Sequence, residues 1–395
     1  MSDLINLFCT LAKIPSPSMR EDAVAEKIMS FFTENGIDCR RDETGNVYAR
    51  VPATDSAKKP VMLSAHMDVV GDDRPVHIVE KDGFIETDKT RTLGADDKAG
   101  VSCAMMLAKE TAADKTLKHG GLEIVFTRDE EQNMTGARNI NYKTLESEHI
   151  LVLDGDRLGE LQIAGAGYTK MTLSVTGTKG GHSGIDIADT SRVNAVKLLA
   201  EIMAQIPQGV YKQDETGVVT SINAGAIAAG GLKNIQTDKQ GAAFMAELAD
   251  KAMTNMINTD AFAVYSIRSS DLKNEEQLHR DIESIVAKFK DKADVSVVFK
   301  RNLPPFERSA DETVTIAARK AAETANVPLT VSSFHAAAET HLYATETNKS
   351  GVVFKPVLLG IANIYNMHSA DEKIERESLV KGYALLKEIF KQINA

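Results

Sequence analysis

Residues 122–132 read LEIVFTRDEEQ, an apolar run that ends in three consecutive acids, Asp129, Glu130 and Glu131. The apolar part has the length of a buried strand and predicts one at 123–127. Like charges crowded at the end of a strand repel one another. We therefore expect a compensating group at the mouth of this strand.

The segments around this strand alternate between helical and strand patterns. The sequence predicts helices at 21–35 and 101–109, and further strands at 61–65 and 150–153. This rhythm is typical of an α/β fold with a mostly parallel sheet sandwiched by helices. In such sheets ligands bind at the carboxyl ends of the strands.

The pattern changes after residue 167. Strands are expected at 170–176, 217–224, 261–268 and 295–300, with helices at 191–205 and 274–289. This order suggests an inserted α+β lid built on an antiparallel sheet. Long helices then return at 311–325 and 377–392. We therefore expect one α/β domain formed by residues 1–167 and 307–395, interrupted by an inserted domain at 168–306.

Length and composition indicate a globular protein with two domains. A chain of 395 residues exceeds one ordinary hydrophobic core. Its net charge of -10 argues against a nucleic-acid partner, which needs a basic face. The three cysteines are too few and too scattered for a disulfide framework. The first residues are too polar for a signal peptide, and no apolar run reaches about 18 residues. A cytoplasmic protein without a membrane partner is the simplest expectation.

The strand segment VMLSAHMDVV at 61–70 places His66 and Asp68 two residues apart. In an extended chain, that spacing puts both side chains on one side. His66 could then bind a metal ion while Asp68 accepts the proton of its other ring nitrogen. The alternative is a surface pair at a strand edge.

Three more segments carry candidate ligands. TLGADDKAG at 92–100 places Asp96 and Asp97 at the start of a helix, where one of them is expected to act as a cap. LVLDGD at 151–156 ends an apolar strand in Asp154, and NMHSADEKI at 366–374 places His368 before a polar turn. The alternative for Asp154 is a place in a solvated turn. The alternative for His368 is a purely structural role.

Taken together, these groups form a mixed nitrogen and oxygen ligand set that zinc accepts. They exceed the three protein ligands of a mononuclear catalytic zinc site. A pair of metal ions roughly 3.5–4 Å apart would use them all and would neutralise the acids after the strand. Only one of Asp129, Glu130 and Glu131 needs to be a ligand, although a turn could bring two of them inward. A free carboxylate beside the metals is what general-base hydrolysis requires.

Five motifs in this order resemble the di-zinc exopeptidase family of peptidase T, aminoacyl-histidine dipeptidase and glutamate carboxypeptidase. The motifs are SAHMDVV (64–70), TLGADDKAG (92–100), RDEEQNMTGA (128–137), LDGD (153–156) and MHSADEK (367–373). The resemblance implies a zinc-exopeptidase-like fold, in which residues 1–167 and 307–395 form the catalytic di-metal domain and residues 168–306 form the lid domain. It also implies one zinc ion held by His66, Asp96 and Asp154, and a second held by Asp96, Glu131 and His368.

The resemblance assigns further roles near the metals. Asp96 would bridge the two ions and precede a cis peptide bond to Asp97. Asp68 would orient His66, and Glu130 would be the general base. Asp129 has no role in this scheme and is expected to be solvated.

The predicted lid also matches family motifs. GTKGGHSGIDI at 177–187 contains His182, which would stabilise the developing oxyanion. Arg268 resembles the family arginine that binds the substrate's C-terminal carboxylate, and its alternative is a surface arginine on a strand. Asn234 resembles a lid asparagine that contacts substrate. The segment FHAAAETHLY at 334–343 contains His335 and Glu339. For both residues, packing within a loop and contact with substrate are the two alternatives.

Within the family, the chain looks most similar to peptidase T and aminoacyl-histidine dipeptidase. The expected activity is therefore hydrolysis of di- or tripeptides by a metallo-exopeptidase. An amidase or deacylase of N-acyl amino acids with the same metal centre is the alternative, and a catalytically silent metal-binding protein is a more remote one. Two zinc ions are expected, with cobalt or manganese as alternatives, and a homodimer would form through the lid.

Overall fold

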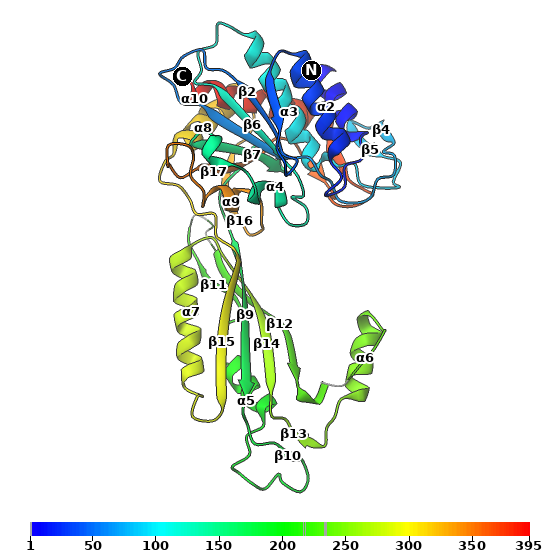
Figure 1. Ribbon diagram of the computed structural model, residues 1–395, viewed down its shortest axis with the longest axis vertical. Helices are drawn as coiled ribbons and strands as arrows, with labels where there is room; N and C mark the ends of the chain where they lie inside the picture. The colour runs from blue at the N-terminus through cyan, green and yellow to red at the C-terminus, as the bar shows by residue number, and fades with distance from the viewer. Residues whose placement is uncertain (1, 216, 218, 233–234) are drawn as a thin grey trace. The chain divides into compact units, whose positions relative to one another are not determined.

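The computed structural model describes residues 2–215, 217, 219–232 and 235–395 (Figure 1). The chain divides into two compact units. One comprises Met1–Gly165 with Phe306–Ala395, and the other comprises Ala166–Pro305. The catalytic and lid roles expected for these units stay predictions.

The first unit is built on an eight-stranded sheet with the order β1-β2-β6-β3-β7-β17-β8-β16. At its centre, β6, β3, β7 and β17 run parallel to one another. The flanking pairs β1–β2, β2–β6 and β17–β8 are antiparallel, and β16 pairs parallel with β8 at the other edge. The strands are β1 (Asp38–Arg41), β2 (Val47–Val51), β3 (Val61–His66), β6 (Leu122–Thr127), β7 (His149–Gly155), β8 (Glu160–Gly165), β16 (Thr330–Phe334) and β17 (Lys355–Gly360).

Helices flank this sheet, as the sequence predicts. Every residue of β3 and of β6 is buried, because a central parallel strand is covered on both faces. Phe32 stacks on Phe126 of β6 with ring centroids 6.2 Å apart, which places a helix directly against the sheet. The long helices are α1 (Ser2–Ala12), α2 (Asp22–Glu34), α3 (Ala95–Ala113), α8 (Thr313–Ala325) and α10 (Arg376–Ile393).

Short elements complete the first unit. A four-stranded sheet has the order β18-β19-β5-β4. Its strands and the remaining short helices are β4 (Ile78–Lys81), β5 (Phe84–Thr87), β18 (Ile364–Tyr365), β19 (Lys373–Glu375), α4 (Thr135–Arg138), η1 (Tyr142–Thr144) and α9 (Thr340–Tyr343).

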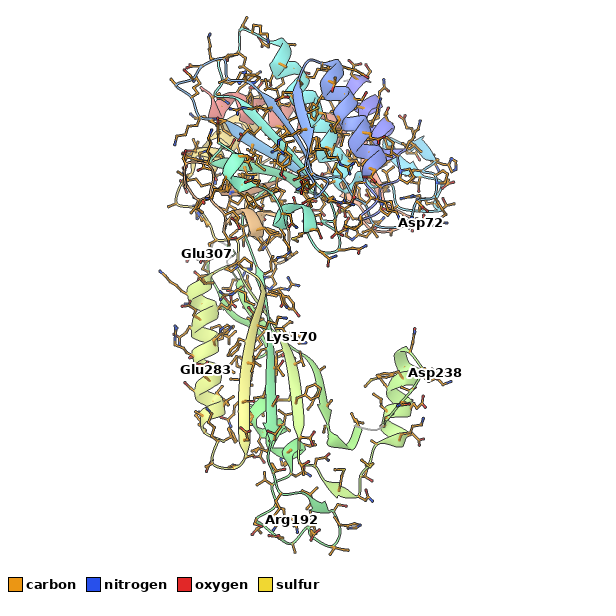
Figure 2. The ribbon with its side chains drawn as sticks, viewed as in Figure 1. Asp72, Lys170, Arg192, Asp238, Glu283 and Glu307 are labelled. Atoms are coloured by element: carbon orange, nitrogen blue, oxygen red, sulfur yellow. The ribbon has the colours of Figure 1, made fainter. Side chains whose placement is uncertain are left out.

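The second unit is an antiparallel sheet with the order β11-β12-β14-β9-β15, and α5 and α7 pack on it. Burial alternates along β9, so one face of the sheet meets the helices. Lys170 on β9 and Glu283 on α7 are exposed (Figure 2). The elements are β9 (Gly167–Thr176), β10 (Gly181–His182), α5 (Ala195–Met203), β11 (Gly209–Gln213), β12 (Val219–Ala229), η2 (Gly230–Leu232), α6 (Gly241–Lys251), β13 (Met256–Ile257), β14 (Ala261–Ser269), α7 (Leu272–Ala287) and β15 (Asp294–Leu303).

Among the described residues, no helix combines the length and the apolar character needed to span a membrane.

Candidate metal centre

The carboxyl ends of three adjacent strands carry most of the predicted ligands. In the sheet, β3 lies between β6 and β7 and runs parallel to both. His66 is the last residue of β3, Asp154 lies near the end of β7, and Glu131 follows the end of β6. Because parallel strands end at the same edge of a sheet, these three side chains gather there.

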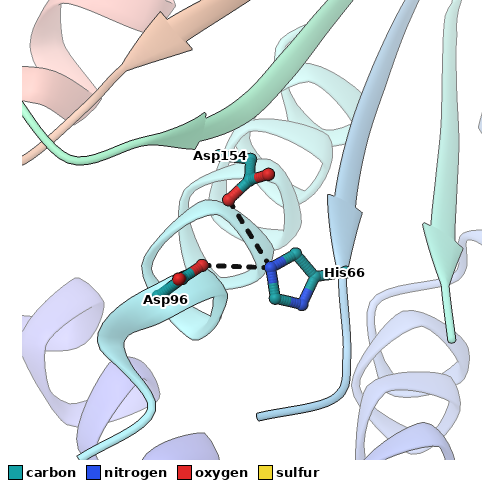
Figure 3. Close-up of side chains that lie close together, drawn as sticks. All are labelled: His66, Asp96 and Asp154. Atoms are coloured by element: carbon teal, nitrogen blue, oxygen red, sulfur yellow. Dashed lines mark hydrogen bonds and ion pairs between the residues drawn. The ribbon is translucent and has the colours of Figure 1, made fainter. Parts of the chain in front are cut away.

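Asp96, at the start of α3, lies at the centre of this cluster. Its Oδ1 is 3.0 Å from the Nε2 of His66, and its Oδ2 is 3.1 Å from the Nε2 of His368. Figure 3 shows Asp96 and Asp154 both facing the His66 ring, and Asp154 Oδ1 is 3.5 Å from the same Nε2. On the other side, Glu131 Oε2 is 3.1 Å from the Nε2 of His368. Asp96 therefore presents one oxygen to each of two imidazoles.

The five side chains form two overlapping groups that share Asp96. Within each group, the ligand atoms all lie within 4.8 Å of one another. The groups are His66, Asp96 and Asp154, and Asp96, Glu131 and His368. The structure thus brings together all five residues that the sequence nominates as ligands, in the two sets that the family resemblance implies.

The chemistry of this cluster fits divalent cations. Two imidazoles and three carboxylates are a donor set that zinc accepts. Glu131 Oε1 is buried and has no hydrogen-bond partner among the described residues. Burial raises the pKa of Asp154 and of Glu131 to about 7, and the negative charge of Asp96 adds to both shifts. A cation among these carboxylates would offset the cost of ionising them in the interior.

Asp68 is buried and contacts both sides of the cluster. The Nδ1 of His66 lies 3.0 Å from the backbone oxygen of Asp68 and 3.5 Å from its Oδ1, so the backbone acceptor is the nearer one. The carboxylate also accepts the backbone N–H groups of Glu130 and Glu131, at 2.9 and 3.2 Å. Asp68 therefore contacts the His66 ring chiefly through its backbone oxygen, while its carboxylate holds the turn that carries both glutamates.

The expectation that Asp129 is solvated is wrong. Its exposed fraction is 1%, and its carboxylate accepts hydrogen bonds from Asn133, at 3.3 Å, and from the Thr135 hydroxyl. The chain turns at Asp129, where φ is 57°, so the alternation expected of an extended strand does not apply. This turn places Asp129 inside and lets both following glutamates approach the cluster.

Glu130 is half-buried beside the ligands. Burial raises the pKa of Glu130 well above its usual range, and the charges of Asp154 and Glu339 add to this against the opposing effect of His66. Glu339 is buried, and its Oε2 accepts the Tyr343 hydroxyl at 3.1 Å. Glu339 is thus an interior acid near Glu130.

The peptide bond between Asp96 and Asp97 is cis, as predicted. Asp97 has the capping role that the sequence leaves to one of the two aspartates, because its Oδ1 accepts the N–H of Gly100 at 2.9 Å. Its Oδ2 also accepts the backbone N–H of His66 at 3.3 Å.

Glu372 is a buried acid beside the cluster. It is not among the residues predicted from the sequence. Its carboxylate accepts the backbone N–H groups of Gly94, Ala95 and Asp96 at 2.8, 2.9 and 3.3 Å, together with the Thr92 hydroxyl. It shares a loop with His368, so it joins the segments that carry two ligands. Nothing in the local sequence distinguishes it from a solvated acid.

The predicted substrate-binding residues belong to the second unit. His182 is exposed, and its Nδ1 accepts the N–H of Gly184 at 3.0 Å, which leaves Nε2 as the donor. Arg192 (Figure 2) pairs with Asp186 at 3.0 Å, and Asp186 accepts the N–H of His182 at 2.8 Å. The loop around His182 is therefore held by an ion pair.

Arg268 lies on β14 with its guanidinium carbon 5.0 Å from the centre of the Tyr168 ring. One terminal nitrogen, Nη1, is buried without a hydrogen-bond partner among the residues that the structure describes. Asn234 lies outside the described residues, and His335 is exposed. Substrate contact by His182, Arg268 and Asn234 stays a prediction.

Known proteins resemble this chain in sequence and in fold. Cytosol non-specific dipeptidase of Escherichia coli is 34% identical over 230 residues, which is 51% of this chain and 46% of the relative. The chain therefore spans about half the length of this curated relative. Aminopeptidase PepT from Bacillus cereus has the same fold, with a TM-score of 0.82, 22% identity, and coverage of 100% of this chain and 99% of that one.

A dinuclear metal-binding peptidase from Bacillus subtilis also shares the fold, with a TM-score of 0.62, 16% identity, and coverage of 99% of this chain and 97% of that one. Residues 62–392 match Peptidase family M20/M25/M40, which spans both the ligand cluster and the second unit. On this match, the chain belongs to peptidase family M20/M25/M40.

Proposed function

We propose that this protein is a di-metal exopeptidase that hydrolyses di- or tripeptides, with Glu130 as the general base. The observation that carries the proposal is Asp96, whose two oxygens face His66 and His368 at 3.0 and 3.1 Å. This is the arrangement expected of a bridging carboxylate. The dipeptidase and aminopeptidase names of the similar proteins support the substrate class.

In this proposal His66, Asp96 and Asp154 hold one ion, and Asp96, Glu131 and His368 hold the other. Zinc suits these ligands, with cobalt or manganese as alternatives. When bound, such ions polarise the scissile carbonyl and lower the pKa of water.

Glu130 has the chemistry required of the base. Its carboxylate would take a proton from the attacking water and pass it to the leaving amine. A base works best when its pKa is near the operating pH, and burial shifts the pKa of Glu130 upward. Asp68 holds this residue through its backbone N–H at 2.9 Å and also contacts the Nδ1 side of His66. The base and one ligand are thus oriented by the same buried acid.

The name of the Escherichia coli relative supports a cytosolic location, which we also propose. Association of two copies through the second unit remains the prediction drawn from the family resemblance.

A hydrolysis screen tests the proposed function. The panel contains di- and tripeptides with free termini, their N-acetyl counterparts, and N-acyl amino acids. Free peptides should be cleaved fastest, activity should disappear after chelation, and zinc, cobalt or manganese should restore it. Faster cleavage of N-acyl amino acids would instead identify an amidase. Tight metal binding without hydrolysis of any substrate would identify a silent metal-binding protein.

Glu372→Gln should weaken metal binding by about 10- to 100-fold, which is typical when a residue that supports metal ligands is replaced. Oε2 accepts the N–H of Gly94, and Oε1 accepts those of Ala95 and Asp96. An amide has only one acceptor oxygen, so one of these two sets would lose its partner. Calorimetric zinc titration of the chelator-treated protein measures the effect. Asp371→Asn, an exposed neighbour in the same loop, is the matched control. Equal affinities in the two variants would show that Glu372 does not organise Asp96.

A further inference from the structure

The segment that links α1 to α2 lies against the candidate metal centre, although it precedes the family match at 62–392. Ser18 donates its hydroxyl to Asp68 Oδ2 at 2.8 Å. Ser16 donates its hydroxyl to the Met67 carbonyl at 2.8 Å and accepts the N–H of Val69 at 2.9 Å. This segment therefore runs alongside the end of β3 and contacts the acid that orients His66.

Glu21, at the end of the same segment, is fully buried. It occupies the N-cap position of α2, but its side chain makes no capping hydrogen bond. Instead, its Oε1 accepts the backbone N–H of Asp129 at 3.1 Å, and its Oε2 pairs with Arg128 at 2.7 Å. The same Oε1 also accepts the backbone N–H of Met19 at 2.7 Å. The carboxylate therefore ties its own segment to the turn after β6 and does not cap its own helix.

The turn at 128–131 is held by two buried carboxylates. Glu21 binds the side chain of Arg128 and the N–H of Asp129, and Asp68 binds the N–H groups of Glu130 and Glu131. The backbone N–H groups of three consecutive residues, 129–131, therefore donate to carboxylates from distant parts of the chain. Since an unpaired buried donor or charge is costly, these contacts restrict where the turn can lie.

We infer that Glu21 is a positioning residue for Glu130, a role that rests on the proposed function. Glu21 fixes the start of the turn by binding Arg128 and the N–H of Asp129. Asp68 fixes its end by binding the N–H groups of Glu130 and Glu131. Ser18 helps to hold Asp68 in place by donating a hydrogen bond to its carboxylate. The segment between α1 and α2 therefore contributes to hydrolysis by positioning Glu130, without contacting the substrate itself.

Glu21→Gln preserves the size of the side chain but removes the charge that pairs with Arg128. We expect kcat to fall by about 10- to 100-fold, because a misplacement of about 1 Å in a reacting group can cost about 10²-fold in rate. KM and metal content should stay close to those of the unmodified protein. Steady-state kinetics on the metal-loaded enzyme measures kcat and KM, and Glu26→Gln, an exposed residue of α2, is the matched control.

A double-mutant cycle with Glu130→Ala separates positioning from general stabilisation. If Glu21 acts through Glu130, Glu21→Gln should cost nothing further once Glu130 is absent. An equal loss in both backgrounds, or a loss of bound metal, would overturn the inference. If Glu21→Gln does not fold, Ser18→Ala takes its place, with an expected loss of a few-fold that also vanishes in the Glu130→Ala background. Full activity of Glu130→Ala alone would refute the proposed base itself, whatever Glu21 does.

Discussion

Glu130→Ala is expected to lower kcat by about 10²–10⁴-fold, the typical contribution of general acid–base assistance. The fold and both metal ions should be retained, because none of the five candidate ligands is altered. In the proposed mechanism Glu130 carries the proton from water to the leaving amine, so its removal would leave this step unassisted. The measurement combines turnover, peptide affinity and metal content on the same preparation.

Glu131→Ala is the matched comparison, since it removes the same side chain from the next residue. Glu131 Oε2 lies 3.1 Å from the Nε2 of His368, within the second ligand group. This variant should therefore lose metal occupancy first and activity as a consequence. If Glu130→Ala instead loses metal while keeping near-normal activity per bound metal pair, the two glutamates have exchanged roles.

Asp96→Ala is expected to remove both metal ions and to reduce hydrolysis to background. Asp96 is the only residue shared by the two groups of candidate ligands in the described part of the chain. Replacing residues that merely support ligands costs about 10- to 100-fold in metal affinity, so the loss of a shared ligand should exceed about 100-fold. Elemental analysis after dialysis against trace zinc measures the remaining metal.

Asp154→Ala provides the control for this prediction. Asp154 belongs to one group only, beside His66 at 3.5 Å. One ion should therefore remain bound by Asp96, Glu131 and His368. Retention of both ions in Asp96→Ala would contradict a bridging role and would require separate ligand sets.

Much of the candidate site is predictable from the sequence, for a local reason. His66, Asp154 and Glu131 each come at or after the end of an apolar run, and parallel strands end at one edge of a sheet. Local spacing does not choose between Asp96 and Asp97, since both stand at a helix start. The family motifs make that choice, and the same motifs identify His368.

The edges of the sheets are harder to predict. The patterns indicate the buried strands β3 and β6, whose residues are apolar almost throughout. They do not indicate β11, where most side chains are exposed. An exposed strand is held by its neighbour's backbone, so its side chains need not be apolar.

Tertiary structure alone decides which acids are buried to support the site. The N–H of Asp129 meets Glu21, which is 108 residues away in sequence. The N–H of Asp96 meets Glu372 across 276 residues. The sequence shows where the glutamates are, but tertiary packing determines which backbone N–H groups come within hydrogen-bond distance of each one. Because burying a carboxylate is costly unless it is hydrogen-bonded, such acids become recognisable only once their distant partners are in place.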